Sequence, residues 1–193
     1  MTRIGITGGI GSGKSGIAEI LRVKGIPVYD ADSASKKLIS TQPELIQNLK
    51  NLLGEDIYDS AGCLNRKRMA ELIFNNPDLL EKTNNIIHPA EGKDFMEWSR
   101  RQPNDIVAIE SALLFQSKMD ISLDSILVVN APQQTRIRRV ILRDNTTYDK
   151  VMARMDKQMS SDEMCAKAHY VIRNDDNDAV LPQINKILSR LGH

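Results

Sequence analysis

The sequence lacks most of the features that mark secreted, membrane-spanning or nucleic-acid-binding proteins. Its 193 residues contain only two cysteines, Cys63 and Cys165, which are too far apart to suggest a disulfide framework or a zinc site. It has no signal-peptide pattern at the N-terminus and no run of about eighteen apolar residues. The formal net charge of +1 provides no basic excess for nucleic acid. We therefore expect a cytoplasmic protein with no nucleic-acid, membrane or obligate protein partner.

Short apolar runs alternate with helical patterns along the chain. Runs rich in valine and isoleucine predict strands at residues 3–7, 26–29, 106–109, 125–129 and 170–172. Apolar residues at helical spacing predict helices at residues 14–24, 43–53, 67–74, 78–87, 133–142 and 179–191. Strands that alternate with helices are typical of a parallel sheet covered on both faces, so we predict a three-layer α/β fold.

Two stretches interrupt this alternation. Residues 41–102 contain helical patterns and no convincing strand, which predicts a helical insertion beside the sheet. A second insertion, predicted to act as a helical lid, spans residues 132–162. The core of the predicted fold then consists of residues 1–40 and 103–193, with the lid inside it.

A glycine-rich segment lies between the first predicted strand and the first predicted helix. Its residues, Gly8 to Ser15, read GGIGSGKS and match the G-x-x-x-x-G-K-[ST] pattern of a phosphate-binding P-loop. Glycines allow successive N–H groups to face one anion, and the helix that follows adds the positive end of its dipole. Lys14 would meet the terminal phosphates of ATP, and the Ser15 hydroxyl would coordinate Mg²⁺. The set predicted to bind the nucleotide here is Gly11, Ser12, Gly13, Lys14, Ser15 and Gly16.

Other motifs bear on the class of P-loop protein. The alternative to a phosphate site is a glycine-rich turn without a ligand, and the Lys-Ser pair between a strand and a helix disfavours it. GTPases usually carry an Asn-Lys-x-Asp motif, which does not follow the strand predicted at 125–129. Motor ATPases usually end a strand with an acidic pair, whereas Glu110 stands alone after residues 106–109. These observations favour a kinase.

Asp30 and Asp32 follow the second predicted strand. Alternation along an extended chain would point both carboxylates the same way, and strand carboxyl ends line the ligand crevice of an open parallel sheet. We assign Asp32 the role of accepting the proton of an attacking hydroxyl. The alternative is that Asp32 caps the helix that follows, and the residues alone leave both interpretations open.

Four arginines lie in the helix predicted after residue 132: Arg136, Arg138, Arg139 and Arg143. Arg139 and Arg143 are four residues apart and share one helix face. Two guanidinium groups on a mobile lid would neutralise charge on the transferred phosphoryl group and exclude water. The alternative is a solvated helix face.

These motifs resemble the dephospho-coenzyme A kinase family over nearly the whole chain. The most specific parts are TGGIGSGKS at residues 7–15 and VYDAD at residues 28–32. Further matches in the family's order are GCLNR at 62–66, IFNNP at 73–77 and IHP at 87–89. The resemblance implies transfer of the ATP γ-phosphate to the ribose 3′-hydroxyl of dephospho-coenzyme A, with Asp32, Lys14 and Arg143 as catalytic residues.

The resemblance also implies roles for residues outside the P-loop. The insertion at 41–102 would hold the acceptor, with Arg66 and a turn at His88-Pro89 near it. His88 has the alternative role of capping a helix and fixing that turn. Arg143 on the lid, with Arg139, would meet ATP, and Asn174 would lie near the adenine.

The chain also departs from the family's pattern. Gly16 replaces a common threonine, and the glycine that usually follows Asn174 is missing. Residues 111–116 lack the usual proline and final acidic residue, which puts in doubt the acceptor or metal role of that loop.

Two rival functions remain compatible with the sequence. A P-loop kinase for another small acceptor, such as a nucleoside, nucleotide or sugar acid, would have a similar core. A regulatory protein that uses the P-loop as a nucleotide-dependent switch would bind nucleotide without transferring phosphate.

Overall fold

The structure is a computed structural model that describes residues 1–74 and 76–192. Asn75, one residue of the 73–77 motif, lies outside the described residues. The chain divides into two compact units. One comprises Met1–Tyr29 and Arg101–His193, and the other comprises Asp30–Arg100.

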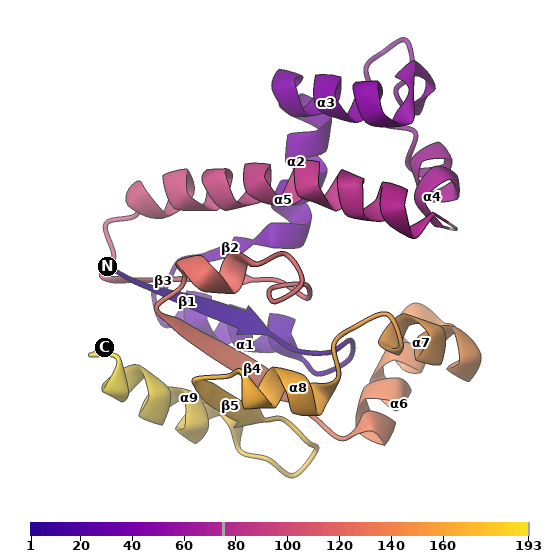
Figure 1. The fold of residues 1–193 in the computed structure, drawn as a ribbon. Coiled ribbons are helices and arrows are strands. Elements are labelled where there is room, and N and C mark those ends of the chain that lie inside the picture. Colours follow the sequence, from indigo (N-terminus) through magenta and orange to yellow (C-terminus); the bar gives the residue numbers. More distant parts are fainter. Residues whose placement is uncertain (75, 193) are drawn as a thin grey trace. The chain divides into compact units, whose positions relative to one another are not determined.

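The first unit is built on a parallel sheet (Figure 1). The five strands lie in the order β2-β3-β1-β4-β5. Their bounds are β1 Thr2–Thr7, β2 Val28–Asp30, β3 Ile106–Glu110, β4 Ser125–Asn130 and β5 Tyr170–Arg173. The central strand β1 pairs in parallel with both β3 and β4, and β4 pairs in parallel with β5. The predicted α/β class and parallel central sheet are therefore confirmed.

Helices of the same unit pack against this sheet and beyond the ends of its strands. They are α1 Lys14–Val23, α6 Gln133–Asp144, α7 Tyr148–Met155, α8 Ser161–Ala166 and α9 Val180–Arg190, with a short 3₁₀ helix η2 at Met119–Ser122. Buried residues of α1 and α9, among them Leu21 and Leu188, form one core cluster with Ile4 and Ile6 of β1. Gly5, between them, faces Leu114 and Leu123 on the other side, because side chains alternate along a strand.

The strand predicted at residues 26–29 is observed as β2 at Val28–Asp30, and the way in which α1 ends explains the later start. Gly25 has φ +81° and reverses the chain, and the N–H of Ile26 donates to the carbonyl of Leu21. Ile26 therefore completes the helix end. Pairing with β3 begins with the carbonyl of Pro27, which accepts from the N–H of Ala108 at 2.8 Å.

The second unit is helical. Its elements are α2 Ala31–Thr41, α3 Pro43–Leu53, the 3₁₀ helix η1 Glu55–Ile57, α4 Arg66–Phe74 and α5 Pro77–Arg100. A separate core cluster forms around Leu45, Leu49 and Tyr58, whose hydroxyl donates to the carbonyl of Ile39 at 2.6 Å. The unit begins at Asp30 rather than at residue 41 because α2 packs against α3 and α5.

The turn expected at His88-Pro89 is wrong, because Pro89 lies inside α5. The helix predicted at 78–87 continues through it to Arg100. Glu91, Phe95 and Ser99, spaced four residues apart, are buried on one face of α5 beyond the proline. Their packing offsets the hydrogen bond that proline removes from a helix.

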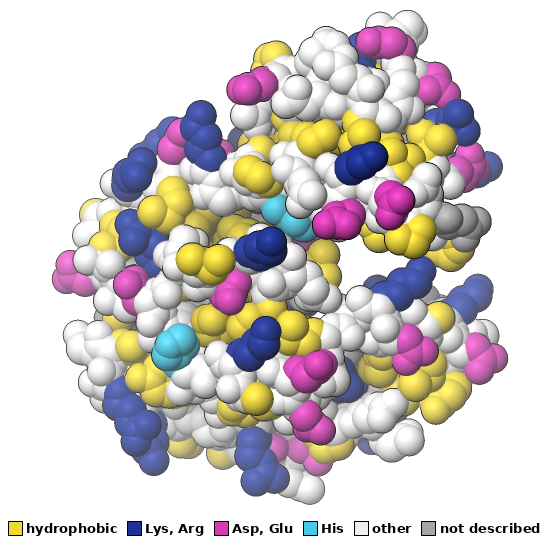
Figure 2. Space-filling view, viewed as in Figure 1, with side chains coloured by type: hydrophobic (Ala, Val, Ile, Leu, Met, Phe, Trp, Pro, Cys, Tyr) yellow, Lys and Arg dark blue, Asp and Glu magenta, His cyan; other side chains and the backbone are white. Residues whose placement is uncertain are grey.

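Surface features agree with the balanced composition. Basic and acidic side chains are interspersed over the face drawn in Figure 2. Cys63 is an exposed free thiol in the helical unit, and Cys165 is a partly buried free thiol in the other unit. Among the residues that the structure describes, no helix combines the length and apolar character that a membrane span requires.

Candidate functional site

The P-loop connects the C-terminal end of β1 to the first turn of α1. Gly11 and Gly13 have φ values of +79° and +90°, which favour glycine. A Cβ at Gly13 would clash with the side-chain amide of Asn174, and one at Gly11 would clash with the carbonyl of Arg136. The two glycines are thus required both by backbone conformation and by close packing.

This loop has the properties of a site for a polyphosphate. Gly13 is the N-cap of α1 and offers no side chain to the helix end, so no side chain caps the N–H groups at the start of the helix. The buried hydroxyls of Thr7 and Ser12 have no hydrogen-bond partner among the described residues. An anion held against the helix end would meet donors that the protein itself leaves free.

Glu110 joins the two P-loop side chains. Its carboxylate accepts a hydrogen bond from the Ser15 hydroxyl at 2.7 Å and lies 3.7 Å from the Lys14 ammonium. The side chains of Lys14 and Glu110 are only 18% and 11% exposed. Glu110 is brought there because β3 pairs with β1 and opposes Ile6, just before the loop. A hydroxyl and a carboxylate are oxygen ligands that suit Mg²⁺.

Sequence reasoning did not assign Glu110 to the site. In the sequence, Glu110 is only the single carboxylate that disfavours a motor ATPase, because the pairing of β3 with β1 is not visible there. The available signal was its position at the end of a buried strand.

Asn174 and Arg139 form a second set of contacts with the loop. The Asn174 side-chain amide donates to the carbonyl of Ser12 at 2.7 Å, and its backbone N–H donates to the carbonyl of Asn130 at 2.8 Å. Arg139 donates to the carbonyl of Asn174 at 2.9 Å and pairs with Asp176 at 3.2 Å. Both predicted residues therefore lie at the P-loop.

Arg143 has different surroundings. Its guanidinium donates to Asp144 at 2.7 Å, and Asp144 also accepts from Arg154 of α7 at 2.7 Å. These two arginines hold the pKa of Asp144 far below its usual range. The Arg143 side chain is 61% exposed. Although Arg139 and Arg143 share a helix face, each has its own acidic partner.

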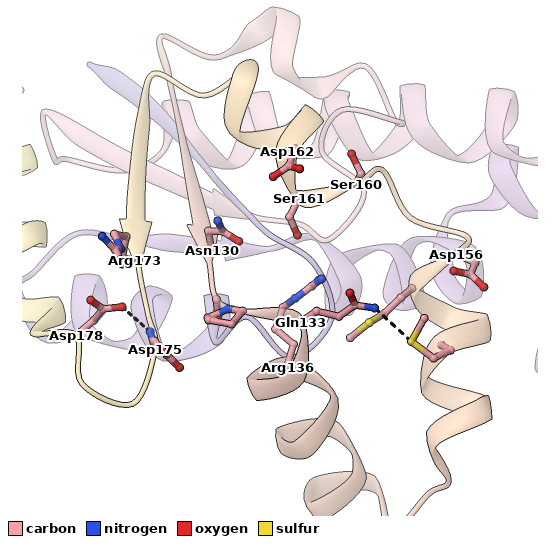
Figure 3. A pocket seen from close by; sticks show the side chains of 14 residues that line it. Asn130, Gln133, Arg136, Asp156, Ser160, Ser161, Asp162, Arg173, Asp175 and Asp178 are labelled. Atoms are coloured by element: carbon pink, nitrogen blue, oxygen red, sulfur yellow. Dashed lines mark hydrogen bonds between the residues drawn. The ribbon is translucent and has the colours of Figure 1, made fainter.

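The segment around Gly9 contacts residues that sequence reasoning did not place at the site. The N–H of Ile10 donates to the side chain of Gln158 at 2.8 Å, and the guanidinium of Arg136 lies against Gly9. Arg136 also lines a cavity of about 520 Å³ between the ends of β4 and β5 and the helices α6 to α8 (Figure 3). In the sequence, Arg136 is one of four arginines of the predicted helix, and no motif distinguishes it from the other three.

In the helical unit, Asp30 and Asp32 have different surroundings. The Asp30 carboxylate accepts from the backbone N–H of Ser33 at 3.0 Å and from its hydroxyl at 2.7 Å, which makes Asp30 the N-cap of α2. Asp32 is an exposed residue in the first helical turn. The capping alternative for Asp32 is therefore wrong. The alternation argument is also wrong, because the helix begins at Ala31.

The two other residues predicted to face the acceptor also belong to this unit. Arg66 is exposed and begins α4. His88 is partly buried in α5, where its Nδ1 atom lies 3.1 Å from the carboxylate of Glu91. The partner of the His88 ring is therefore Glu91, about one helical turn away in the same helix.

Comparisons with known proteins identify relatives over nearly the full chain. The family model described as dephospho-CoA kinase matches residues 2–179. The dephospho-CoA kinase of Bacteroides fragilis strain YCH46 is 40% identical over 190 residues, which cover 98% of this chain and 92% of that protein. The dephospho-CoA kinase of Porphyromonas gingivalis is 41% identical over 189 residues, covering 97% and 93%.

A solved structure agrees with these sequence relatives. The crystal structure of TT1252 from Thermus thermophilus matches with a TM-score of 0.85 and 33% identity, and covers 98% of this chain and 97% of that one. Family model, sequence and structure coincide over both compact units, and this chain belongs to the dephospho-CoA kinase family.

Proposed function

We propose that this protein transfers the γ-phosphate of ATP to the ribose 3′-hydroxyl of dephospho-coenzyme A in the cytoplasm, giving coenzyme A and ADP. The observation that carries the proposal is the joining of Lys14, Ser15 and Glu110 at the P-loop of a chain from this family. A phosphate loop with its ammonium and hydroxyl in place requires only an acceptor and a positioned base to become a kinase.

In this mechanism the P-loop and α1 hold the ATP phosphates. The Lys14 ammonium neutralises negative charge on the terminal phosphates, and Ser15 and Glu110 would hold a Mg²⁺ ion. When bound, the ion would supply further positive charge to the ATP phosphates. Asn174, whose side chain is tied to the loop, contacts the adenine side of the nucleotide.

The helical unit supplies the acceptor side of the reaction. Residues 41–102 bind dephospho-coenzyme A, with Arg66 and His88 among the contacts. The Asp32 carboxylate accepts the proton of the ribose 3′-hydroxyl. The hydroxyl oxygen then bonds to the γ-phosphorus, and the bond from the γ-phosphorus to the leaving oxygen of ADP breaks. Asp32 is available for this role because Asp30 caps the helix.

Residues 132–162 act as the lid. Arg139 and Arg143 approach the phosphates when the lid closes, which places positive charge on the transferred group and excludes water. Exclusion is important because water is the competing acceptor.

The test is a coupled assay of ADP release with MgATP and dephospho-coenzyme A, in which mass spectrometry identifies the product. We expect a product one phosphate heavier than the acceptor, at a rate that depends on both substrates. Lys14→Ala serves as the matched control. Turnover only with a nucleoside, nucleotide or sugar acid would favour a different kinase. ATP binding without any transfer would favour a regulatory switch.

A further inference from the structure

Arg136 holds a guanidinium group directly beside the P-loop. A Cβ added at Gly9 would clash with the Nη1 atom of Arg136, and one at Gly11 would clash with its carbonyl. The N–H of Arg136 donates to the carbonyl of Pro132 at 3.0 Å, so the first turn of α6 fixes its backbone. Figure 3 shows its side chain extending from α6 toward the cavity.

The charge of Arg136 has no partner among the described residues, unlike the other arginines of α6. Arg138 and Arg139 both pair with Asp176. Arg143 pairs with the carboxylate next to it in sequence. In the described part of the chain, by contrast, no ion pair reaches Arg136, and its buried Nε atom lacks a hydrogen-bond partner. Burial lowers the pKa of Arg136, with no opposing contribution from a carboxylate.

Carboxylates that line the same cavity do not supply the missing charge. Asp175 accepts the Thr135 hydroxyl at 2.8 Å, and Asp178 accepts the backbone N–H of Asp175 at 2.8 Å. Within the described residues, no carboxylate oxygen lies within 4.0 Å of the Arg136 guanidinium nitrogens. The group is therefore partly removed from water without compensation, which costs free energy.

We propose that Arg136 binds a phosphate oxygen of the nucleotide held by the P-loop. This inference rests on the proposed binding of ATP at Lys14 and Ser15. A phosphate would give the guanidinium charge-assisted hydrogen bonds and recover the cost of its burial. The P-loop is the anion site that Arg136 already touches.

A neighbouring contact gives Arg136 a specific task. The N–H of Ile10, beside Gly9, donates to Gln158 and is occupied. The Gln158 side-chain oxygen also lies 3.8 Å from the position of a Cβ on Gly9. Because the backbone donor in this part of the loop is used inside the protein, Arg136 supplies donors to the phosphate there.

The experiment is calorimetric titration of MgATP into wild-type protein, Arg136→Gln, Arg136→Met and Arg138→Gln. We expect Arg136→Gln and Arg136→Met to weaken MgATP binding by about 10- to 100-fold, since a hydrogen bond to a charged group is lost. Arg138→Gln removes an exposed arginine of the same helix and should change affinity by less than about twofold. Wild-type affinity in a folded Arg136→Met protein would show that the side chain only packs against Gly9 and would overturn the inference.

Two further measurements keep the outcome unambiguous. The NMR resonance of the Arg136 Nε–H group in the wild-type protein should shift when MgADP or MgATP binds. An unchanged resonance with both nucleotides would overturn the inference even if the variants failed to fold. Lys14→Ala in the same titration separates the two proposals, because its loss of binding beside wild-type affinity in Arg136→Gln would overturn only the role of Arg136. Wild-type affinity in Lys14→Ala would contradict the P-loop assignment itself.

Discussion

Two carboxylates at the start of α2 have different surroundings although they are only two positions apart. The Asp30 carboxylate accepts hydrogen bonds from the N–H and the hydroxyl of Ser33, while Asp32 is an exposed residue of the first turn. The sequence left catalysis and capping as alternatives for Asp32 because both need an acidic residue before a helix. The first helical residue, Ala31, makes Asp30 the cap and excludes capping by Asp32. A sequence pattern does not locate that residue, because it defines helix ends only within a few residues.

This difference predicts opposite defects in two variants. Asp30→Ala should destabilise the protein by about 1 kcal/mol through loss of the cap, with kcat nearly unchanged. Asp32→Asn should preserve stability and lower kcat by roughly 10²- to 10⁴-fold, more than it raises the KM for ATP. Urea unfolding and steady-state kinetics of both variants measure the contrast. A stability defect in Asp32→Asn that accounts for its lost turnover would contradict the catalytic assignment.

Lys14 provides a second residue-scale prediction. Lys14→Ala should reduce kcat/KM by roughly 10³-fold or more, because the charge opposite the terminal phosphates is lost. The fold should survive, since the only ion pair of Lys14 among the described residues is a long, partly buried contact with Glu110. Circular dichroism would establish folding, and substantial activity in the folded variant would argue against the P-loop as the site.

Glu110 should act through the metal ion. Glu110→Gln keeps an acceptor for the Ser15 hydroxyl but removes the negative charge that favours Mg²⁺. We expect the Mg²⁺ concentration for half-maximal activity to rise by about 10-fold or more, with turnover partly restored at saturating Mg²⁺. An unchanged Mg²⁺ dependence would exclude Glu110 as a ligand.

The P-loop could be predicted because its spacing is local, whereas Glu110 and Arg136 reach it only through strand pairing and helix packing.

At the scale of elements, the buried strands were predictable because short runs rich in valine and isoleucine are typical of buried parallel strands. The helices α7 and α8 were not predicted separately, since eight and six residues give little periodicity. The start of α8 is instead specified by a capping box, in which Ser160 and Glu163 exchange hydrogen bonds. The proline in α5 misled the prediction because packing beyond it outweighs the local preference.

The link between α6 and α7 predicts a defined pH and mutational response. Arg143 and Arg154 lower the pKa of Asp144 relative to the unfolded chain, so its stabilising effect is present above the unfolded pKa of about 4 and is lost as pH falls through the lower folded pKa. Asp144→Asn removes the charge at neutral pH. Hydrogen exchange in residues 145–160 should then become faster, while exchange in β1 and β3 stays unchanged. Equal exchange in both proteins at neutral pH would show that this link does not order the segment.

At the scale of the whole molecule, each compact unit has its own core. One core cluster joins the sheet to α1 and α9, and another joins the helices of residues 30–100. Helical periodicity without strand patterns predicts a separate helical part. Its beginning was not predictable, because the last residue of β2 is also the N-cap of α2 and no linker composition marks the border.

The two units should respond to different ligands. MgATP alone should slow hydrogen exchange in residues 1–29 and 101–192, most strongly around the P-loop. Dephospho-coenzyme A alone should slow exchange within residues 30–100. Mass spectrometry of peptides from each unit would resolve the two patterns. Protection of residues 30–100 by MgATP alone would contradict this division of binding.

The placement of the two thiols provides a natural handle for observing the acceptor. Cys63 is exposed in the helical unit, whereas burial raises the pKa of the partly buried Cys165 thiol and so reduces its thiolate fraction. A maleimide dye should therefore attach first at Cys63, three residues before Arg66 and without any engineered substitution. The natural chain thus carries a single preferred position for a fluorescent reporter, and it lies in the unit where the acceptor is proposed to bind.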